Sequence, residues 1–392
     1  MEPFTIAVVC FWTCAVLVVY AYLGYPVLIW VLARVFGQMP APPHKDEFEW
    51  PSVSLLIPAY NEERVIEERI RNALAMDYPA DRLQIVVGSD GSTDATNAIA
   101  RSYAGQGVEL LDYEVRRGKA SILNQTIPGL RGELVLMSDA NTMIDFDALR
   151  RLAQWFHDPS IGAVCGRLVL IDPANGRNVD GLYWTYETFI KKCENQLGAL
   201  LGANGGLYLV RRALYAPIPA TTTVDDLVIP LRAKLATGCR IVYEASAVAR
   251  EETAPDIEGE FRRRARNGTG DFRSMEILWP LLNPVWGWTA FAFFSHKFLR
   301  LLCPFLLILL LASSVILSDR PIYRAALLGQ LGFYLIAVAA GYTPLHPKVF
   351  RFLRLTTMFS GMNLALLLGF WRWIWGTQKG IWNPTGRQGQ RA

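Results

Sequence analysis

An apolar run without a charged residue constrains this chain most. No Asp, Glu, Lys or Arg occurs between residues 3 and 33. A helix needs about 20 apolar residues to cross the hydrocarbon core of a bilayer, so the run is long enough for one crossing. Gly24-Tyr25-Pro26 predicts a kink or an end inside it. A signal peptide fits poorly, because no basic region precedes the run and no small-residue cleavage site follows it. We therefore expect a transmembrane helix within residues 1–36.

Four further apolar stretches lie in the C-terminal part, at 277–295, 301–318, 325–345 and 355–371. The first contains two prolines and many aromatic residues and follows an Arg-rich segment, so we expect residues 251–297 to form basic and interfacial helices. The other three have the length and composition of membrane spans, which predicts about three transmembrane helices within 298–371.

Positive charge gives these spans an orientation. Arg34 and Lys45 follow the first run, whereas only Glu2 precedes it. Basic residues favour the cytoplasmic side, so we expect a multi-pass protein of the cell (inner) membrane whose central domain faces the cytoplasm. Three further crossings would leave the tail, 372–392, outside, yet its basic residues favour the inside. The number of crossings is therefore left open.

Composition excludes several other classes. Hydrophobic residues make up 52% and charged residues 19%, which is too apolar for a disordered chain. The net charge of +4 is too small to indicate a nucleic-acid partner. The 6 cysteines form no C-x-x-C pair and the 4 histidines are scattered, so neither a disulfide framework nor a His-based zinc site is expected.

Between the apolar regions, a polar linker at 37–50 leads into alternating strands and helices. We expect strands at 53–58, 83–88, 108–111 and 133–137, and helices at about 62–76, 92–104 and 118–129. Such alternation predicts an α/β domain with a parallel sheet covered on both faces, which we place at 51–250. Ligands bind such sheets beyond the C-terminal ends of the strands.

Polar clusters follow three of these strands. They are Pro58-Ala59-Tyr60-Asn61-Glu62, Ser89-Asp90-Gly91-Ser92-Thr93-Asp94 and Ser138-Asp139-Ala140-Asn141. Each alone is also typical of an ordinary turn or helix cap. Three of them at one edge of one sheet favour a binding site.

In order, and with Gly118-Lys119 and Leu123-Asn124, these clusters resemble family 2 glycosyltransferases of the GT-A fold. With the flanking apolar segments, the chain resembles the polysaccharide-synthase branch, which includes hyaluronan, chitin-oligosaccharide, poly-N-acetylglucosamine and cellulose synthases. The resemblance extends over about residues 50–300. It implies a cytosolic, Rossmann-like GT-A domain with a mostly parallel sheet, between N- and C-terminal transmembrane helices.

The resemblance implies the nucleotide side of the site. Asp90 would take the nucleobase or ribose of a nucleotide-sugar through charge-assisted hydrogen bonds. Ala59 and Glu62 would line the same pocket, and Lys119 would approach the nucleotide. A solvated surface lysine is the alternative for Lys119.

The resemblance also implies a metal. Asp139 matches the first carboxylate of the family's D-x-D motif, and would hold Mg²⁺ or Mn²⁺ against the diphosphate. Asn141 stands at the last Asp of that motif. Its amide oxygen can ligate, but without charge, which indicates a lower or differently shared metal affinity.

On the catalytic side, Thr223-Val224-Asp225-Asp226 resembles the family's T-E-D motif. Asp226 would be the base that takes the proton from an acceptor hydroxyl as the oxygen attacks the anomeric carbon. Asp225 would orient or ligate nearby; a helix N-cap pair is the alternative. A single displacement inverts the configuration, so an α-linked donor gives a β-linked product.

The resemblance also implies that the loop at 202–208, which contains Asn204 and Gly205, lies on the acceptor side.

The 263–267 segment aligns with the family's Q-x-x-R-W motif, in which Arg266 would clamp the diphosphate. Arg263 replaces the Gln of the motif. Asn267 replaces the Trp that lies under the acceptor sugar in processive synthases. A basic patch attracted to anionic lipid is the alternative reading. Trp184, inside the expected soluble domain, is a better substitute for the missing Trp than Trp279, Trp286 and Trp288, for which membrane anchoring is favoured. Residues 382–387 loosely resemble a gating element.

We therefore expect a membrane-bound, inverting, metal-dependent hexosyl- or N-acetylhexosaminyltransferase. It would move a sugar from a UDP-sugar to a growing polysaccharide or lipid-linked glycan, with the bilayer and export proteins as further partners. One alternative is a non-processive transferase that adds a single sugar to a glycolipid. Another is an inactive nucleotide-binding scaffold or transporter, against which Asp90, Asp139 and Asp226 argue.

Overall fold

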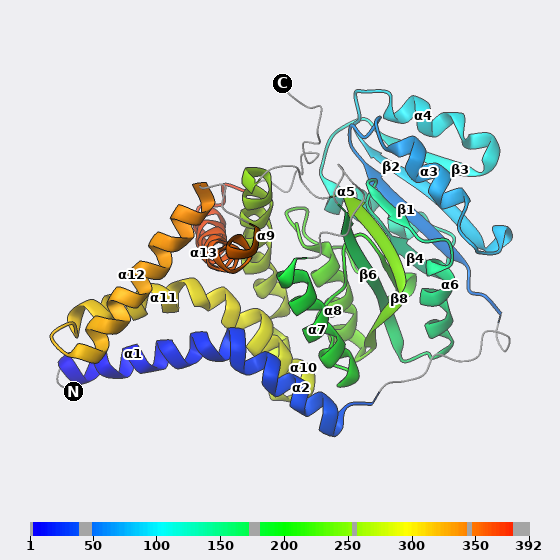
Figure 1. The fold of residues 1–392 in the computed structure, drawn as a ribbon. Coiled ribbons are helices and arrows are strands. Elements are labelled where there is room, and N and C mark those ends of the chain that lie inside the picture. Colours follow the sequence, from blue (N-terminus) through cyan, green and yellow to red (C-terminus); the bar gives the residue numbers. More distant parts are fainter. Residues whose placement is uncertain (1–2, 39–48, 172–180, 253–256, 343–346, 379–392) are drawn as a thin grey trace. The chain divides into compact units, whose positions relative to one another are not determined.

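The computed structural model describes residues 3–38, 49–171, 181–252, 257–342 and 347–378 (Figure 1). The chain divides into two compact units. A membrane-helix unit holds Met1–Leu28, Ile257–Phe272 and Phe293–Thr377, and a sheet unit holds Ile29–Asp256 and Arg273–Ala292. The expected linker and the gating-like motif at 382–387 lie largely or wholly outside the described residues.

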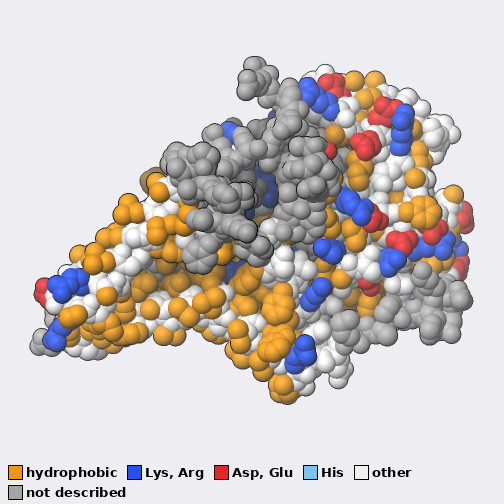
Figure 2. Space-filling view, viewed as in Figure 1, with side chains coloured by type: hydrophobic (Ala, Val, Ile, Leu, Met, Phe, Trp, Pro, Cys, Tyr) orange, Lys and Arg blue, Asp and Glu red, His pale blue; other side chains and the backbone are white. Residues whose placement is uncertain are grey.

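Long apolar helices make up the membrane-helix unit. Three helical stretches of the described chain are long and apolar enough to cross a membrane: Phe4–Phe36, Trp288–Ile316 and Pro321–Ala340. The individual helices are α1 (Pro3–Val19), α2 (Tyr25–Phe36), α9 (Ile257–Leu278), α10 (Trp288–Ala292), α11 (Leu299–Ile316), α12 (Pro321–Tyr342) and α13 (Pro347–Ile374). Figure 2 shows hydrophobic side chains gathered over α1, α11 and α12, whereas charged side chains of both signs are spread over the sheet unit.

The first long helix does not end at Gly24-Tyr25-Pro26. A π-helical turn, Tyr20–Gly24, connects α1 directly to α2. Pro26 lacks a backbone N–H and would interrupt an α-helix, and the π-turn directly before it lets the helix continue into α2. Polar side chains then link this helix to others of its unit: Tyr20 Oη lies 2.8 Å from Ser295 Oγ, and Tyr22 Oη donates to Asn363 Oδ1 at 3.3 Å.

In the stretch expected at the interface, the chain forms two short 3₁₀ turns, Trp279–Leu282 and Pro284–Trp286. Trp288 then begins the second membrane-length stretch, which starts before residue 298, where the first C-terminal membrane span was expected to begin. α13 covers the expected span at 355–371 but is not among the three membrane-length stretches of the described residues. The domain boundaries and the number of crossings stay predictions.

The sheet unit is built around one mixed sheet of 8 strands in the order β3-β2-β1-β4-β7-β6-β8-β5. β1 pairs in parallel with β2 and β4, and β2 with β3. β7 runs antiparallel to β4 and β6, and β5 runs antiparallel to β8. The strands are β1 (Val53–Ala59), β2 (Leu83–Asp90), β3 (Val108–Tyr113), β4 (Leu134–Met137), β5 (Thr142–Ile144), β6 (Ile161–Ile171), β7 (Tyr208–Arg211) and β8 (Arg240–Glu252).

Helices follow the strands of the parallel half in alternation. They are α3 (Ile66–Leu74), α4 (Thr96–Ser102) and α5 (Lys119–Thr126), and the second half adds α6 (Ala148–Ala153), α7 (Leu182–Gln196) and α8 (Asp225–Thr237). The predicted α/β domain and its four strands are therefore confirmed. Our prediction assigned no strand beyond residue 137, so it did not include β5 to β8, where β6 and β8 pair in parallel and the other pairings are antiparallel.

The core lies between the sheet and its helices. Leu55, Ile57 and Leu136 point from neighbouring strands and are 0% exposed, as are Ile66 and Ile70 of α3. Full burial of one such side chain stabilises a fold by about 1.5–3 kcal/mol. This packing fixes the strands whose C-terminal ends carry the polar clusters.

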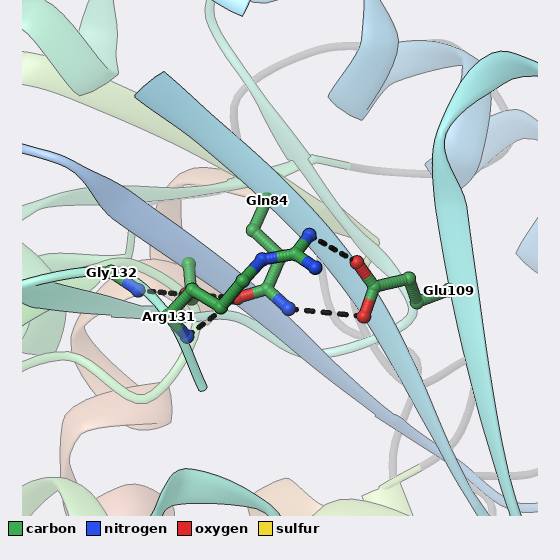
Figure 3. A network of polar contacts seen from close by, with 5 residues as sticks. Gln84, Glu109, Arg131 and Gly132 are labelled. Atoms are coloured by element: carbon green, nitrogen blue, oxygen red, sulfur yellow. Dashed lines mark hydrogen bonds and ion pairs between the residues drawn. The ribbon is translucent and has the colours of Figure 1, made fainter. Parts of the chain in front are cut away.

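A polar network joins β1 to β4 near their N-terminal ends, away from the polar clusters (Figure 3). Gln84 of β2 donates to Glu109 of β3 at 3.0 Å and accepts from Ser54 of β1 at 2.6 Å. Arg131, just before β4, pairs with Glu109 and donates its backbone N–H to Gln84 at 2.9 Å. Ser54 and Gln84 are buried and satisfy each other, whereas Glu109 and Arg131 are partly or largely exposed, so the network links neighbouring strands from the core to the surface.

Candidate active site

The loops that follow β1 and β2 are bonded to each other. Asn61 lies in the left-handed region, with φ of 53°, and its Oδ1 accepts the backbone N–H of Thr93 at 2.8 Å. The backbone N–H of Glu62 donates to Thr96 Oγ1 at 2.8 Å. Ala59, the last residue of β1, is 0% exposed beneath this junction. The two sequence motifs therefore form one structure at the C-terminal edge of the sheet.

Asp90 is buried and holds the next loop. Its two carboxylate oxygens accept the backbone N–H groups of Arg117 at 2.7 Å and Gly118 at 2.8 Å. Gly118, with φ of 90°, precedes the first residue of α5. Asp90 thus shapes the turn that presents Lys119, and a direct contact to a nucleotide stays a prediction.

Lys119 brings together two carboxylates from distant parts of the chain. Its Nζ lies 2.8 Å from Asp139 Oδ1 and 3.2 Å from Asp225 Oδ1. Burial by itself lowers the pKa of Lys119, but the two carboxylates outweigh it and raise the pKa above the ordinary value. Lys119 is therefore a fixed positive charge at the centre of the site and not a solvated surface lysine.

The two aspartates at the start of α8 differ in environment. The side chain of Asp225 is 9% exposed and accepts a hydrogen bond from Tyr208 Oη at 3.2 Å. Burial, together with Asp225, raises the pKa of Tyr208 well above its ordinary value, so the phenol stays protonated and donates. Asp226 is only partly buried. This contrast gives Asp225 a fixed, paired position and leaves Asp226 the more accessible carboxylate.

The loop at 202–206 lies against Asp226. The backbone N–H of Ala203 donates to the Asp226 carbonyl at 2.8 Å. A Cβ placed on Gly205 would lie 3.5 Å from Asp226 Oδ2, at ordinary van der Waals distance, so Gly205 lies directly beside this carboxylate. Asn204 donates to the Gly166 carbonyl at 2.6 Å and accepts from Lys191. The expected acceptor loop and the expected base are therefore adjacent.

The expected metal ligands fit a cation held mainly by substrate. Asp139 is 37% exposed, whereas Asn141 donates to Glu251 Oε1 at 3.1 Å. The flanking hydroxyls of Ser138 and Thr142 are buried and have no hydrogen-bond partner in the described structure. No group of three or more His, Cys, Asp or Glu side chains in the described chain could hold a metal alone. Mg²⁺ needs only one or two protein oxygens beside phosphates and water.

The comparisons with known proteins agree with this geometry. Residues 54–215 match the family model described as glycosyl transferase family 2. This chain contains a family 2 glycosyltransferase domain.

Relatives of the family 2 domain include synthases named for two kinds of product, a polysaccharide and a glycolipid. The poly-beta-1,6-N-acetyl-D-glucosamine synthase of Staphylococcus aureus is 28% identical over 57% of this chain and 55% of its own length. The beta-monoglucosyldiacylglycerol synthase of Synechocystis is 30% identical over 47% of this chain and 41% of its own length. The matched region thus spans about half the length of these relatives.

One solved structure has a fold similar to that of this chain, both in the family 2 domain and outside it. A mannosyltransferase from Pyrobaculum calidifontis, solved with GDP-Man and Mn²⁺, superposes with a TM-score of 0.70 at 23% identity. The superposition covers 93% of this chain and 99% of the other. The predicted GT-A fold, with helices apolar enough to span a membrane, is therefore confirmed.

Three predicted site residues are not brought to this cluster by any described contact. Trp184 lies on α7, where its ring contacts Tyr183 with centroids 6.4 Å apart. Arg263 and Arg266 lie on α9, in the membrane-helix unit. Their roles toward the acceptor and the diphosphate stay proposals.

Our sequence reasoning missed three residues of the site. Tyr208 was visible, because it ends the acceptor-loop motif, but its hydrogen bond to Asp225 was not. Lys191, which donates to Asn204, carries no local signal beyond its place on a helix. Arg69 of α3 is 0% exposed, and burial lowers the pKa of its guanidinium to about 10 against the opposing effect of Asp139. In the sequence, Arg69 shares the helical spacing of Ile66, Ile70 and Ala73, and an arginine on the apolar face of a helix is the signal that could have identified it.

Proposed function

We propose that this protein is a membrane-bound, inverting glycosyltransferase that moves a sugar from a nucleotide-sugar, expected to be a UDP-sugar, to a glycan or glycolipid acceptor. The observation that carries the proposal is the meeting of Asp139 and Asp225 on one ammonium, Lys119, with Asp226 and Gly205 beside them. A structural ion pair would not require a third, partly exposed carboxylate beside it.

The donor half of the proposal rests on charge. Lys119 carries one positive charge against the two carboxylates of Asp139 and Asp225, so an anionic diphosphate would be bound here together with a divalent cation. The interlocked loops of Asn61 and Thr93 hold the expected nucleotide pocket, with Glu62 at its edge. Preorganised charges of this kind favour the developing negative charge of a leaving diphosphate.

The metal is part of the same proposal. Asp139, with Asn141 beside it, would hold Mg²⁺ or Mn²⁺, and the bound ion would neutralise charge on the donor diphosphate. The orphaned hydroxyls of Ser138 and Thr142 leave polar atoms for water or substrate at this place. Support also comes from the similar mannosyltransferase, whose structure contains Mn²⁺.

Asp226 would supply the catalytic base. It is partly buried, lies next to Gly205, and follows Asp225, which Tyr208 and Lys119 hold in place. The carboxylate would take the proton of an acceptor hydroxyl while that oxygen attacks the anomeric carbon from the face opposite the diphosphate. General-base catalysis of this kind contributes about 10²–10⁴-fold. An α-linked donor would then give a β-linked product.

Two acceptor classes remain in the proposal, and each has its own support. A growing polysaccharide is supported by the similarity to the poly-beta-1,6-N-acetyl-D-glucosamine synthase. A single transfer to a glycolipid is supported by the similarity to the beta-monoglucosyldiacylglycerol synthase. Asn267, where processive synthases have Trp, favours short products.

The membrane placement completes the proposal. Three membrane-length helical stretches flank the sheet unit in sequence, and the positive-inside rule puts the catalytic domain in the cytoplasm. A cytoplasmic site has direct access to nucleotide-sugars and, through the membrane helices, to a lipid-linked or exported glycan.

A donor panel on isolated membranes tests this function. Membranes containing wild type or Asp226→Asn are incubated with radiolabelled UDP- and GDP-sugars, with and without Mn²⁺, and products are sized. We expect one donor to be transferred by wild type only, to lipid-extractable product or to polymer. Equal incorporation by both samples with every donor would refute the proposal.

A further inference from the structure

A buried ammonium without a counter-ion lies at the far end of α8 from the catalytic aspartates. Lys234 is 6% exposed, and among the described residues no carboxylate pairs with it. Its Nζ has only two long contacts, 3.4 Å each, to the carbonyls of Gly198 and Cys239. Ordinary N–H···O bonds are 2.7–3.2 Å, and buried charges are normally paired.

The surroundings of Lys234 leave its charge uncompensated. Burial lowers its pKa, and the positive charge of Arg240 lowers it further. Arg240 is itself paired with Asp158 at 3.6 Å, which leaves Lys234 as the cation here that has no carboxylate partner among the described residues. The electrostatics of this place therefore favour an anion.

Lys234 lines a cavity of about 370 Å³, a size typical of small-molecule sites. The opposite wall is Val285-Trp286-Gly287-Trp288-Thr289, and Leu197, Gly198 and Gly238 complete it. A Cβ added at Gly198, Gly238 or Gly287 would meet nothing within 4 Å, so the mouth is open. The cavity thus has one charged end and one aromatic wall.

The cavity lies where two membrane-length helical stretches end. Phe36 is the last residue of the first stretch and Trp288 the first residue of the second, and their ring centroids are 5.7 Å apart. The backbone N–H of Gln38 donates to the Gln196 carbonyl at 2.8 Å, which ties the end of α2 to the end of α7. Helix ends of this kind lie at the depth of lipid headgroups, where Trp is enriched.

Exposed apolar side chains surround the same place. Val285 is 80% exposed, Phe36 57% and Trp288 38%. Such residues at the ends of spans are expected to contact acyl chains and the headgroup boundary. Because an ammonium, an aromatic wall and a lipid-facing rim occur together, we propose that the Lys234 cavity binds the phosphate of an anionic phospholipid.

This inference rests on the membrane placement proposed above and is independent of the transfer reaction. The occupant is a lipid and not a free anion, since the aromatic wall and exposed rim offer apolar surface that inorganic phosphate cannot use. A net negative headgroup, such as that of phosphatidylglycerol, fits better than that of phosphatidylcholine, whose ammonium would face Lys234.

Lipid retention by the full-length protein tests the site. Delipidated protein in detergent is titrated with phosphatidylglycerol, phosphatidylcholine or glycerol phosphate, and bound lipid is counted by native mass spectrometry. We expect phosphatidylglycerol to bind wild type most tightly, and about tenfold more weakly to Lys234→Gln, as is typical for loss of one charged hydrogen bond. Lys192→Gln, which removes an exposed lysine of α7, should bind like wild type.

Other outcomes overturn the inference. If Lys234 only neutralises the carbonyls at the ends of α7 and α8, Lys234→Gln will melt at a lower temperature yet retain phosphatidylglycerol like wild type. Glycerol phosphate bound as tightly as the lipid would show a free-anion site instead. Should Lys234→Gln fail to fold, Trp286→Ala, which keeps the charge and removes the aromatic wall, should still weaken lipid retention severalfold; unchanged retention would contradict the proposal.

Discussion

Lys119 Nζ lies 3.2 Å from Asp225 Oδ1, although the two residues begin different helices, α5 and α8. The same ammonium lies 2.8 Å from Asp139, directly after β4. The side chain of Lys119 therefore holds Asp139, the expected metal ligand, at a fixed distance from Asp225, which precedes the expected base Asp226. Positions held this way need little reorganisation during a reaction.

Asp226→Asn should lower turnover by about 10²–10⁴-fold, because the amide cannot take the acceptor proton. Nucleotide binding should change little, since Asp225 keeps its contacts with Tyr208 and Lys119. Initial rates and calorimetric binding of the nucleotide diphosphate measure the two quantities. A variant that retains more than half of the wild-type rate would show that Asp226 is not the base.

Lys119→Met should destabilise the protein, because it leaves the buried carboxylate of Asp225 without its cation. Asp225→Asn in the same background should recover part of the loss. A double-mutant cycle on thermal or denaturant unfolding should give a coupling free energy of roughly 0.5–3 kcal/mol. Additive effects of the two changes would mean that the ion pair contributes nothing to stability.

Asp139→Ala should abolish the effect of Mn²⁺ on donor binding, and excess metal should not restore it. Asn141→Asp is the matched gain-of-charge variant: a second carboxylate at the D-x-D position should strengthen metal binding. Affinity for UDP with and without Mn²⁺ measures both effects. The assignment fails if Asp139→Ala binds UDP with the same metal dependence as wild type.

Wild type should make short products or add single sugars, because Asn267 offers the acceptor ring no aromatic face. Asn267→Trp should lengthen the products, and Trp184→Ala should reduce transfer if Trp184 replaces the missing stacking surface. Gel or size-exclusion analysis of labelled product gives the chain lengths. Long polymer from wild type, unaffected by Trp184→Ala, would contradict this interpretation of the 263–267 motif.

The parallel half of the fold could be predicted because its signals are local. Each strand from Val53 to Met137 is a short apolar run bounded by turn residues, and the polar clusters follow three of them directly. The order of those clusters also carried the family resemblance. Local pattern and global fold agree in this part of the chain.

The mixed half of the sheet, β5 to β8, could not be predicted in the same way. β5 has only 3 residues, and the pairing of β6 with β8 contains a register shift after Gly166, which interrupts the expected alternation. Strand order there depends on contacts between segments far apart in sequence, as for β4 with β7. Periodicity along the chain does not report such pairings.

The site was partly predictable for a related reason. Motif positions indicated Asp139, Asp225 and Asp226, but not that Lys119 would contact two of the three. The contact of Asp90 with a nucleotide stays a prediction, whereas its hydrogen bonds from the backbone of Arg117 and Gly118 had no signal in the sequence. Residue type predicts what a side chain can bind, whereas the fold decides which of several partners it reaches.

The anomeric configuration of the product tests the central claim most directly. Once a donor is found, the coupling constant of the anomeric proton in the transferred sugar is measured by NMR. A single displacement assisted by Asp226 predicts a β-linked product from an α-linked donor, formed about 10²–10⁴-fold more slowly by Asp226→Asn. An α-linked product, or a β-linked product formed at the wild-type rate by Asp226→Asn, would contradict the account.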